Sequence, residues 1–341
     1  MMDFAARKQA LIDLGQLLAS EYGQGEMRKH FPLAYRQNGW FRAEDSQKAL
    51  DALINNYLAE EELNAFLANY QPEDYPISKP VGLVLAGNIP MVGIKDILLC
   101  FLAGHKAQIK YSSKDAVLIP ALLALWKQQQ PAVEPYFEVV DQLKNFDAVI
   151  ATGSDNSARY FEHYFSKKPH IIRKNRKSVA VLSGEETEEE ILALGRDIFD
   201  YFGLGCRSVA KVYLPKGFNF ELFMQRLEAF TPLEHHSKYR NNYDYNRSLY
   251  LLNGQEHYVN AVLALLPLPA LESRIASLHY EFYTDLAELE QQLAKEEDKI
   301  QVLVNQRLKI ARPSVKFGQA QQPKWSNFAD GKDTLAFLLD L

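Results

Sequence analysis

Cys206 is the residue whose type and surroundings point most directly to chemistry. It lies in the sequence GLGCRS over residues 203–208, between a helical pattern over 188–202 and an apolar run over 209–214. The two glycines permit a sharp turn and a close approach of substrate, and the neighbouring Arg207 is a cation that favours a thiolate. The pattern predicts a nucleophilic cysteine. A buried cysteine that packs as a small apolar side chain is the alternative that the loop alone leaves open.

Cys100, the second of the two cysteines, lies in the apolar sequence ILLCFL over 97–102 and is expected to be a core residue. Two cysteines in unrelated surroundings form neither a disulfide framework nor a zinc site, so no metal is expected. No basic-then-apolar leader opens the sequence, and its most apolar stretch, 91–104, contains Lys95 and Asp96. We therefore expect no signal peptide and no membrane span, and a soluble, cytoplasmic protein.

Composition and charge limit the classes of function. The chain has 341 residues, of which 47% are hydrophobic, and this length suits roughly two or three domains. Its formal net charge of -5 argues against a general nucleic-acid-binding protein, so no nucleic-acid partner is expected. A basic run over 167–177 is the local exception, with six cations in eleven residues. A solvated surface and a site for a phosphate-bearing cofactor are the two interpretations of this run.

The periodicity of apolar residues divides the chain into a helical first part and an α/β remainder. Helical spacing prevails over 1–75. From residue 76 onward, short apolar runs over 81–86, 107–111, 137–140 and 148–152 alternate with helical patterns that begin at Val92, Asp115 and Asn156. Such alternation is typical of a parallel sheet with crossover helices, whose ligands bind at the carboxyl ends of the strands.

Polar residues follow three of these expected strands. They are Gly87-Asn88-Ile89-Pro90 after the first strand, Lys110 to Lys114 after the second, and Thr152-Gly153-Ser154 after the fourth. Each group can place a side chain or an amide at one crevice, but the same residues are common in turns, so a turn asparagine, a strand-end lysine and an N-cap serine remain alternatives. Neither G-x-G-x-x-G nor a Walker sequence follows these strands, which disfavours an ordinary Rossmann dehydrogenase and a P-loop enzyme.

A second α/β pattern begins near Ser183, where Thr187 to Glu190 is typical of a capping box. Beyond the Cys206 loop we expect strands over 209–214, 275–280 and 300–304, and helices over 220–230, 258–266 and 286–294. The tyrosine-rich stretch 239–250, preceded by His235 and His236, is expected to be a loop. Packing, a cover over the substrate and a subunit interface are its possible roles.

Taken in order, the three strand-end groups and the Cys206 loop resemble the signature of the aldehyde dehydrogenase superfamily. Within it, residues 82–90, 110–115 and 203–215 are most similar to the fatty acyl-CoA reductases of the LuxC type, and the resemblance covers 76–341. It implies an aldehyde-dehydrogenase-like α/β fold. The implied parts are an N-terminal helical segment (1–75), a dinucleotide-binding domain (76–182), a catalytic cysteine domain (183–310) and a tail (311–341) that returns to the nucleotide domain or to a subunit interface.

The resemblance also implies roles for individual residues. Cys206 corresponds to the nucleophile, and Asn88 corresponds to the asparagine whose amide binds the oxyanion together with the backbone N–H of the cysteine. Lys110 matches the lysine that holds the adenosine ribose. Gly153 and Ser154 match the pair that contacts the pyrophosphate at a helix N-terminus. Two further cofactor-binding positions are expected at Ser112 and Ser113.

Two departures from the superfamily pattern refine the expected reaction. Arg173 stands near the position of a glutamate that activates water in hydrolytic aldehyde dehydrogenases, so a thioester on Cys206 lacks an obvious base for hydrolysis, whereas coenzyme A leaves readily as a thiol. Ser113 stands where many NAD-preferring relatives have a ribose-binding glutamate. Without the carboxylate of that glutamate, and with Lys114 next in the chain, the site would tolerate a 2′-phosphate. The resemblance therefore favours NADPH, with NADH as the second choice.

The sequence therefore predicts NAD(P)H-dependent reduction of an acyl-CoA, or of another acyl thioester, to an aldehyde through a thioester on Cys206. A fatty acyl group is the favoured substrate, and a homo-oligomer is compatible with the chain. Two alternatives are a hydrolytic aldehyde dehydrogenase and a non-catalytic relative that binds a nucleotide.

Overall fold

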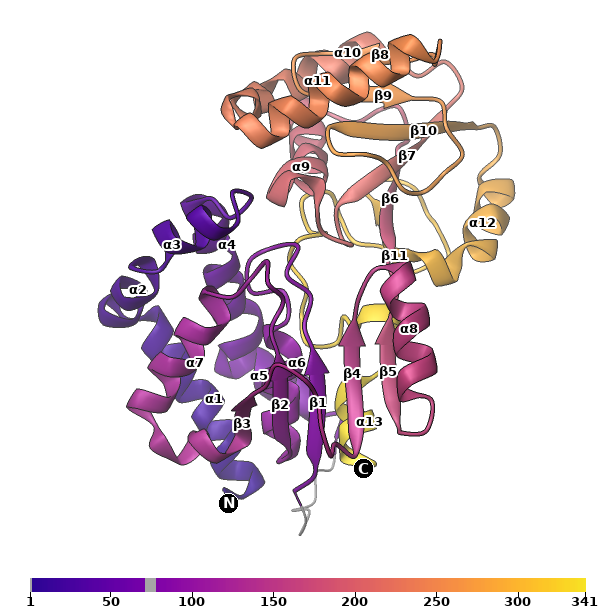
Figure 1. Cartoon of the computed structure of the whole chain (residues 1–341). Helices are drawn as coiled ribbons and strands as arrows, with labels where there is room; N and C mark the ends of the chain where they lie inside the picture. Colours follow the sequence, from indigo (N-terminus) through magenta and orange to yellow (C-terminus); the bar gives the residue numbers. More distant parts are fainter. Residues whose placement is uncertain (1, 71–77) are drawn as a thin grey trace. The chain divides into compact units, whose positions relative to one another are not determined.

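A computed structural model describes residues 2–70 and 78–341 of the chain (Figure 1). Its contacts divide the chain into two compact units, which we call the first unit (residues 1–175 and 323–341) and the second unit (176–322). The expected domain boundary at 75/76 lies outside the described residues. The chain passes from the first unit to the second after Asn175, where the sequence led us to expect a boundary at 182/183.

The first unit begins with short helices, as the helical periodicity predicts. They are α1 (Phe4–Ala19), α2 (Glu21–Arg28), α3 (Phe31–Gln37), α4 (Ala43–Leu53) and α5 (Glu60–Leu67), with a π-helical turn η1 (Ile54–Leu58) before α5. Side-chain caps explain two of the starts, because Asp3 accepts a hydrogen bond from the N–H of Ala6 and Ser20 accepts one from the N–H of Gly23. The expected N-terminal helices are thus confirmed.

A parallel sheet follows in the first unit. Its described strands are β1 (Pro80–Val84), β2 (Lys106–Lys110), β3 (Phe137–Val139), β4 (Ala148–Thr152) and β5 (His170–Arg173), in the order β3-β2-β1-β4-β5. The connecting helices are α6 (Ile94–Ala103), α7 (Leu118–Gln129), η2 (Pro131–Tyr136) and α8 (Asp155–Phe165). The four strands expected from the sequence are confirmed. β5 was not expected, because only two apolar residues separate its basic flanks.

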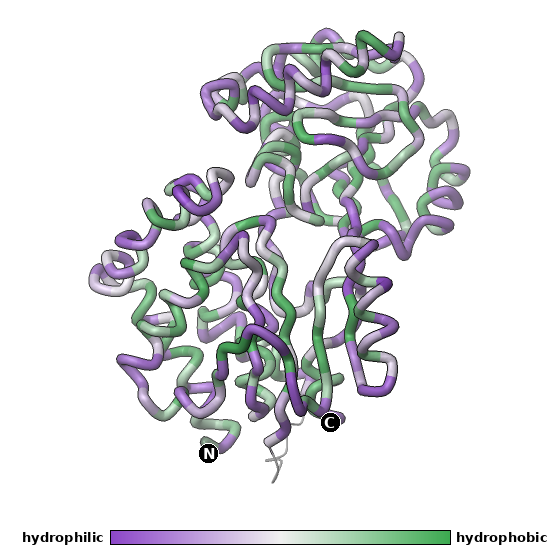
Figure 2. The backbone as a smooth tube through the Cα atoms, in the orientation of Figure 1, coloured by the Kyte–Doolittle hydropathy of each residue, from purple (hydrophilic) through white to green (hydrophobic). Residues whose placement is uncertain are grey.

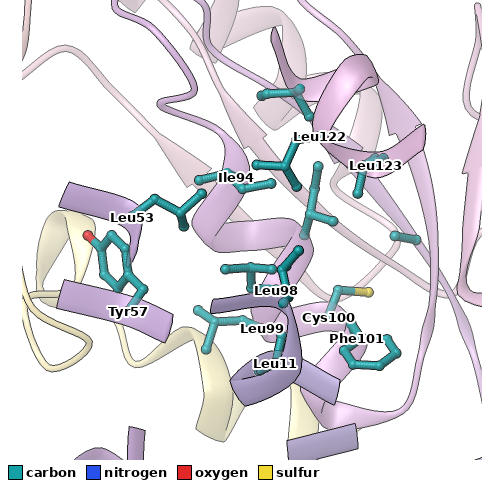
Figure 3. Packing of buried hydrophobic residues seen from close by; sticks show 14 of the residues in the cluster. Leu11, Leu53, Tyr57, Ile94, Leu98, Leu99, Cys100, Phe101, Leu122 and Leu123 are labelled. Carbon is teal, nitrogen blue, oxygen red and sulfur yellow. The ribbon is translucent and has the colours of Figure 1, made fainter. Parts of the chain in front are cut away.

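The sheet and the N-terminal helices share one hydrophobic core. Figure 2 shows hydrophobic residues along the central strands β1 and β4, as expected of parallel strands covered on both faces. Leu11 of α1 and Leu53 of α4 pack in the same cluster as α6 and α7 (Figure 3). Cys100 is fully buried there, which confirms it as a core residue, and burial raises the pKa of its thiol. Each fully buried leucine contributes about 1.5–3 kcal/mol, so the N-terminal helices are an integral part of this unit.

The C-terminal tail returns to the first unit from Pro323 onward. It contains η6 (Ala329–Gly331) and α13 (Thr334–Leu339). Trp325 stacks on Phe66 with ring centroids 5.2 Å apart, and its indole N–H donates to the carbonyl of Tyr57 at 2.8 Å. The ammonium of Lys95 donates to the carbonyl of Trp325 at 2.8 Å. These contacts fasten the end of the chain to α5, η1 and α6.

The second unit contains a mixed sheet with the order β11-β6-β7-β10-β9-β8 among the described residues. Its strands are β6 (Lys177–Val181), β7 (Val209–Pro215), β8 (Tyr258–Val259), β9 (Ala264–Leu266), β10 (Ser277–Tyr283) and β11 (Ile300–Asn305). Only the β8–β9 pair is antiparallel in this described sheet. Its helices are α9 (Glu188–Phe199), η3 (Asp200–Gly203), α10 (Phe220–Arg226), η4 (Leu227–His235), α11 (Ser237–Leu252), α12 (Leu286–Lys295) and η5 (Glu297–Lys299). The capping box of Thr187 and Glu190 is present at the start of α9.

The tyrosine-rich stretch 239–250 is a helix, α11, so the expectation of a loop is wrong. Tyr239, Tyr243 and Tyr250 recur at helical spacing and are all less than 10% exposed. Their hydroxyls bind inside the unit, for example Tyr239 to the carbonyl of Val262 at 2.9 Å. The ring of His236 accepts from the N–H of Tyr239 and caps the helix. Packing is therefore the role that these tyrosines have within this unit.

The expected helix over 258–266 is also wrong, because the structure has strands β8 and β9 there. The side-chain oxygen of Asn260 accepts hydrogen bonds from the N–H groups of Val262 and Leu263, at 3.0 and 2.9 Å, and thereby forms a turn. The apolar run that follows is a fully buried short strand. Periodicity alone does not distinguish such a run from a buried helix.

Candidate active site

The predicted oxyanion donor Asn88 and the predicted cofactor-binding residues lie at one edge of the first sheet. They follow β2, β1 and β4, which are neighbours in the sheet and run parallel, so their carboxyl ends meet at the same edge (Figure 1). The strand order reverses between β1 and β4, and ligands of open α/β sheets bind at such a switch point. The structure thus brings together Asn88, Lys110 to Ser113, and the Gly153-Ser154 pair.

The loops after β1 and β2 touch each other at Gly87. A Cβ atom built on Gly87 would lie 2.6 Å from both Cβ and Oγ of Ser112, so a larger residue would push the loops apart. The Ser112 hydroxyl accepts a hydrogen bond from the N–H of Lys114 at 3.2 Å and shapes a turn. The side chains of Lys110 and Ser113 are exposed beside this turn.

Asp115 is a supporting residue that the sequence reasoning missed. It is 2% exposed, and its carboxylate accepts hydrogen bonds from the N–H of Met91 at 2.7 Å and of Leu118 at 3.3 Å. Burial raises the pKa of Asp115 to about 6, against the lowering effect of these hydrogen bonds. The contact fixes Met91, which has a left-handed φ of 55°, and with it the loop that carries Asn88. The available sequence signal was an aspartate at the expected start of a helix, and the structure places it three residues before α7 begins at Leu118.

The helix α8 begins directly after the Gly153-Ser154 pair. Ser154 is the N-cap, and its hydroxyl accepts from the N–H of Ser157 at 3.3 Å. A Cβ atom on Gly153 would lie 2.8 Å from that of Ser157, so this position also requires glycine. The N-cap interpretation of Ser154 is confirmed. It is compatible with the cofactor-binding interpretation, because the N–H groups of a first helical turn attract a phosphate.

Cys206 lies in the second unit, in the turn between η3 and β7. It is partly exposed, which removes the fully buried alternative, whereas Cys100 is 0% exposed. Its carbonyl accepts a hydrogen bond from the Ser178 hydroxyl at 3.0 Å, and the N–H of Ser208 donates to Gly205 at 3.2 Å. One hydrogen bond from Ser178 of β6 and one between residues of the turn itself therefore hold the backbone around Cys206.

A strained backbone precedes this turn. Tyr201, Phe202 and Gly203 have consecutive left-handed φ angles of 53°, 57° and 71°. For the two aromatic residues this conformation costs on the order of 1–3 kcal/mol each. Burial holds it in place, because Tyr201 and Phe202 are 7% and 1% exposed. Strain of this kind occurs preferentially where a reactive side chain must be presented.

Arg173 lies at the end of β5 and is 8% exposed. Its guanidinium forms an ion pair with Asp96 at 2.5 Å and donates to the Thr334 hydroxyl at 3.0 Å. At least four of the six cations in the basic run pair with carboxylates, namely Lys168, Arg173, Lys174 and Lys177. These pairs favour a structural and solvated role for the run over a phosphate site.

The described residues contain no cluster of three metal-binding side chains. Within the same residues, no helix has the length and hydrophobicity to cross a membrane.

Solved aldehyde dehydrogenases have the same fold. Aldehyde dehydrogenase 21 of Physcomitrella patens matches 99% of this chain and 84% of its own, with a TM-score of 0.70 and 12% identity. An NAD-dependent aldehyde dehydrogenase of Sinorhizobium meliloti matches 92% of this chain and 74% of its own, with a TM-score of 0.67 and 11% identity. At these identities the likeness is one of fold, and it confirms the expected aldehyde-dehydrogenase-like α/β architecture.

Sequence comparison is more specific. A long-chain acyl-protein thioester reductase of Aliivibrio fischeri is 27% identical over 173 residues, which cover 45% of this chain and 36% of that relative. The match thus spans well under two thirds of the relative's length. The family model described as acyl-CoA reductase (LuxC) matches residues 32–231, more than half of the chain and a range that includes both Asn88 and Cys206. The chain therefore belongs to the acyl-CoA reductase (LuxC) family, within the aldehyde-dehydrogenase-like fold.

Proposed function

We propose that this protein reduces an acyl thioester to an aldehyde through a covalent thioester on Cys206. One observation carries the proposal: of the two cysteines, Cys206 is partly exposed in a hydrogen-bonded turn that follows a strained backbone segment, whereas Cys100 is enclosed in the core. A nucleophile needs this combination of access and fixed backbone. Membership of the acyl-CoA reductase family supports the same reaction.

The reaction begins with attack of the Cys206 thiolate on the acyl carbonyl carbon. As the new C–S bond forms, the carbonyl oxygen becomes an oxyanion, for which the side-chain amide of Asn88 and the N–H of Cys206 are the donors. The oxyanion then collapses, the C–S bond to coenzyme A breaks, and the departing thiolate takes a proton from water. A reduced nicotinamide, when bound, would supply a hydride to the carbonyl carbon of the acyl-enzyme. The resulting thiohemiacetal oxyanion collapses, the Cys206–carbon bond breaks, and the aldehyde and the Cys206 thiolate are the products.

The residues at the edge of the first sheet fit a nicotinamide dinucleotide. Gly87 and Gly153 stand where a Cβ atom would collide with neighbours, so backbone lines this edge closely. The first turn of α8 offers N–H groups to a pyrophosphate, with Gly153 and Ser154 at its start. Lys110 would hold the adenosine ribose, with Ser112 and Ser113 beside it. The absence of a carboxylate at Ser113 favours NADPH over NADH.

The acyl donor is a thioester whose leaving group is a good thiol. Acyl-CoA is the donor that we favour, in line with the family description. A fatty acyl group is the favoured chain, as the resemblance implies. The Aliivibrio fischeri relative is named for an acyl-protein thioester, so a protein-bound thioester is the second donor of the same chemical class. Arg173, which is paired with Asp96, stands near the position that the resemblance gives to the base of hydrolytic aldehyde dehydrogenases, and this supports transfer to a thiol over hydrolysis.

The proposal is tested by following absorbance at 340 nm with NADPH or NADH and a panel of acyl-CoAs of increasing chain length. We expect NADPH consumption that depends on acyl-CoA, release of one aldehyde and one free thiol per NADPH, and no activity in Cys206→Ala. Oxidation of free aldehyde to free acid without coenzyme A would instead indicate a hydrolytic aldehyde dehydrogenase. No turnover with any donor, combined with nucleotide binding, would indicate a non-catalytic relative.

A further inference from the structure

A segment near the end of the second unit runs along the Cys206 loop. We call residues 315–321 the strap. It starts beside β11, where Val315 pairs in parallel with Val304 and exchanges backbone hydrogen bonds of 2.9 Å with Leu303 and Asn305. It ends at Gln321, one residue before the chain leaves the second unit.

One buried carboxylate holds the middle of the strap. Asp197, near the end of α9, is 1% exposed. Its two oxygens accept hydrogen bonds from the N–H of Gly318 at 2.6 Å and of Ala320 at 2.9 Å. Gly318 has a left-handed φ of 79°, and a Cβ atom there would lie 3.1 Å from the guanidinium of Arg196. The strap therefore passes α9 as closely as a glycine allows.

The strap in turn holds the two residues that follow Cys206. The guanidinium of Arg207 donates through Nε to the carbonyl of Ala320. The side-chain amide of Gln321 donates to the hydroxyl of Ser208 at 3.0 Å, and Ser208 is 1% exposed. Ala320 thus connects Asp197 to Arg207, because its N–H donates to Asp197 and its carbonyl accepts from Arg207.

The charges around Asp197 indicate that it is a strong acceptor at neutral pH. Burial raises the pKa of Asp197 to about 6, its hydrogen bonds to Gly318 and Ala320 lower it, Asp200 raises it and Arg196 lowers it. Above pH 6 the group is a carboxylate with two N–H donors, and hydrogen bonds to a charged acceptor are about twice as strong as neutral ones.

We propose that Asp197 is a positioning residue for the nucleophile: through the strap it holds Arg207 and Ser208, and so fixes the Cys206 thiol and the cation beside it. The proposal rests on the proposed function, since it concerns the same cysteine. Asp197 acts through the strap rather than on the substrate. Its loss lets the loop that follows Cys206 move and weakens the preference for the thiolate.

Alkylation of the native protein by iodoacetamide tests this directly, because Cys100 is buried and the label reports Cys206. The first variant is Asp197→Asn, which weakens the hydrogen bonds that residue 197 accepts from the N–H groups of the strap. The second is Gln321→Ala, which removes only the hydrogen bond to Ser208. For Asp197→Asn we expect the rate at pH 7 to fall roughly threefold to tenfold, and the midpoint of the rate–pH profile to rise by about half to one pH unit. Gln321→Ala should shift both in the same direction by less.

Asp45→Asn is the matched control, because Asp45 is also a fully buried aspartate but pairs with Arg42 in the N-terminal helices. We expect it to lower thermal stability without moving the alkylation profile. An unchanged profile in a folded Asp197→Asn protein would overturn the inference. If that variant does not fold, an unchanged profile in Gln321→Ala overturns it instead.

Measurements on the wild-type protein distinguish a failure of the inference from a failure of the proposed function. If wild-type Cys206 accepts an acyl group while both variants keep the wild-type profile, the inference alone fails. If wild-type Cys206 neither reacts with iodoacetamide nor accepts an acyl group, the proposed function fails and the inference fails with it.

Discussion

Asn88 is the residue whose proposed role rests on a single amide group. It is half-buried in a loop that two contacts define, the close approach of Gly87 to Ser112 and the hydrogen bond from Met91 to Asp115. A loop fixed in this way presents the amide in one orientation, as a donor for a developing oxyanion requires. A plain turn asparagine needs no such support, so the two interpretations differ in the cost of removing the side chain.

We expect Asn88→Ala to lower kcat by roughly 10²–10³, the usual loss for one oxyanion donor. The measurement is steady-state reduction of the best acyl-CoA, with Asn64→Ala, an exposed asparagine of α5, as the control. Cofactor affinity should change little, because only the oxyanion contact is lost. A loss of less than about fivefold would assign Asn88 to the turn alone.

At the scale of one residue, the sequence predicted candidate site residues but not the residues that support them. Cys206 was predicted from its own loop, and the roles of Asn88 and of the Gly153-Ser154 pair were predicted from the resemblance to aldehyde dehydrogenases. Asp115 and Asp197 were not, because the partners that give them their role (Met91 for Asp115, Gly318 and Ala320 for Asp197) lie 24 residues or more away in the chain. Long-range hydrogen bonds from a buried carboxylate leave no local pattern.

At the scale of the element, the packing of β5 gives Arg173 a structural role in addition to the one that the sequence suggested. The sequence placed this arginine where a hydrolytic base is missing. The structure shows in addition that it is the buried partner of Asp96 on α6 and of Thr334 on α13. Arg173→Glu is therefore a poor test for hydrolysis, because it places two carboxylates together in the interior.

The ion pair of β5 gives a stability prediction. We expect Arg173→Ala to lower the free energy of unfolding by about 3–5 kcal/mol, since it leaves the Asp96 carboxylate buried without its cation. The double variant Asp96→Leu/Arg173→Met should recover most of this loss. Lys174→Ala breaks the neighbouring exposed pair with Glu162 and should cost less than about 1 kcal/mol. Urea denaturation of the four proteins measures these differences, and equal losses for Arg173→Ala and Lys174→Ala would contradict the account.

Elements were predicted best where apolar runs and flanking turns agreed. β4 was expected over 148–152 and has those bounds. The errors at α11 and at 258–266 have one cause. In both segments, hydrogen bonds between side chains and distant or turn backbone determine whether the residues form a helix, a strand or a loop. Tyr239 and Tyr243 of α11 donate to carbonyls of the 260–262 turn, and the side chain of Asn260 stabilises that turn. Neither contact is visible in a window of neighbouring residues.

At the scale of the whole molecule, the residues to which the proposal assigns roles are divided between the two units. Asn88 and the predicted cofactor-binding residues belong to the first unit, and Cys206 belongs to the second. The order of the motifs along the chain predicted this division, whereas the inclusion of the N-terminal helices in the first core did not follow from any motif. Helical periodicity shows that an apolar face exists, but not which surface covers it.

The acyl-enzyme itself is the most direct test of the central claim that Cys206 is the nucleophile. The protein is mixed with a fatty acyl-CoA in the absence of nicotinamide nucleotide, and its intact mass is measured, followed by peptide mapping. We predict a mass increase of one acyl group on the peptide that contains Cys206, removal of that group by added coenzyme A faster than by water, and no increase in Cys206→Ala. An acyl group on another residue, or an unmodified protein that still reduces acyl-CoA, would contradict the account.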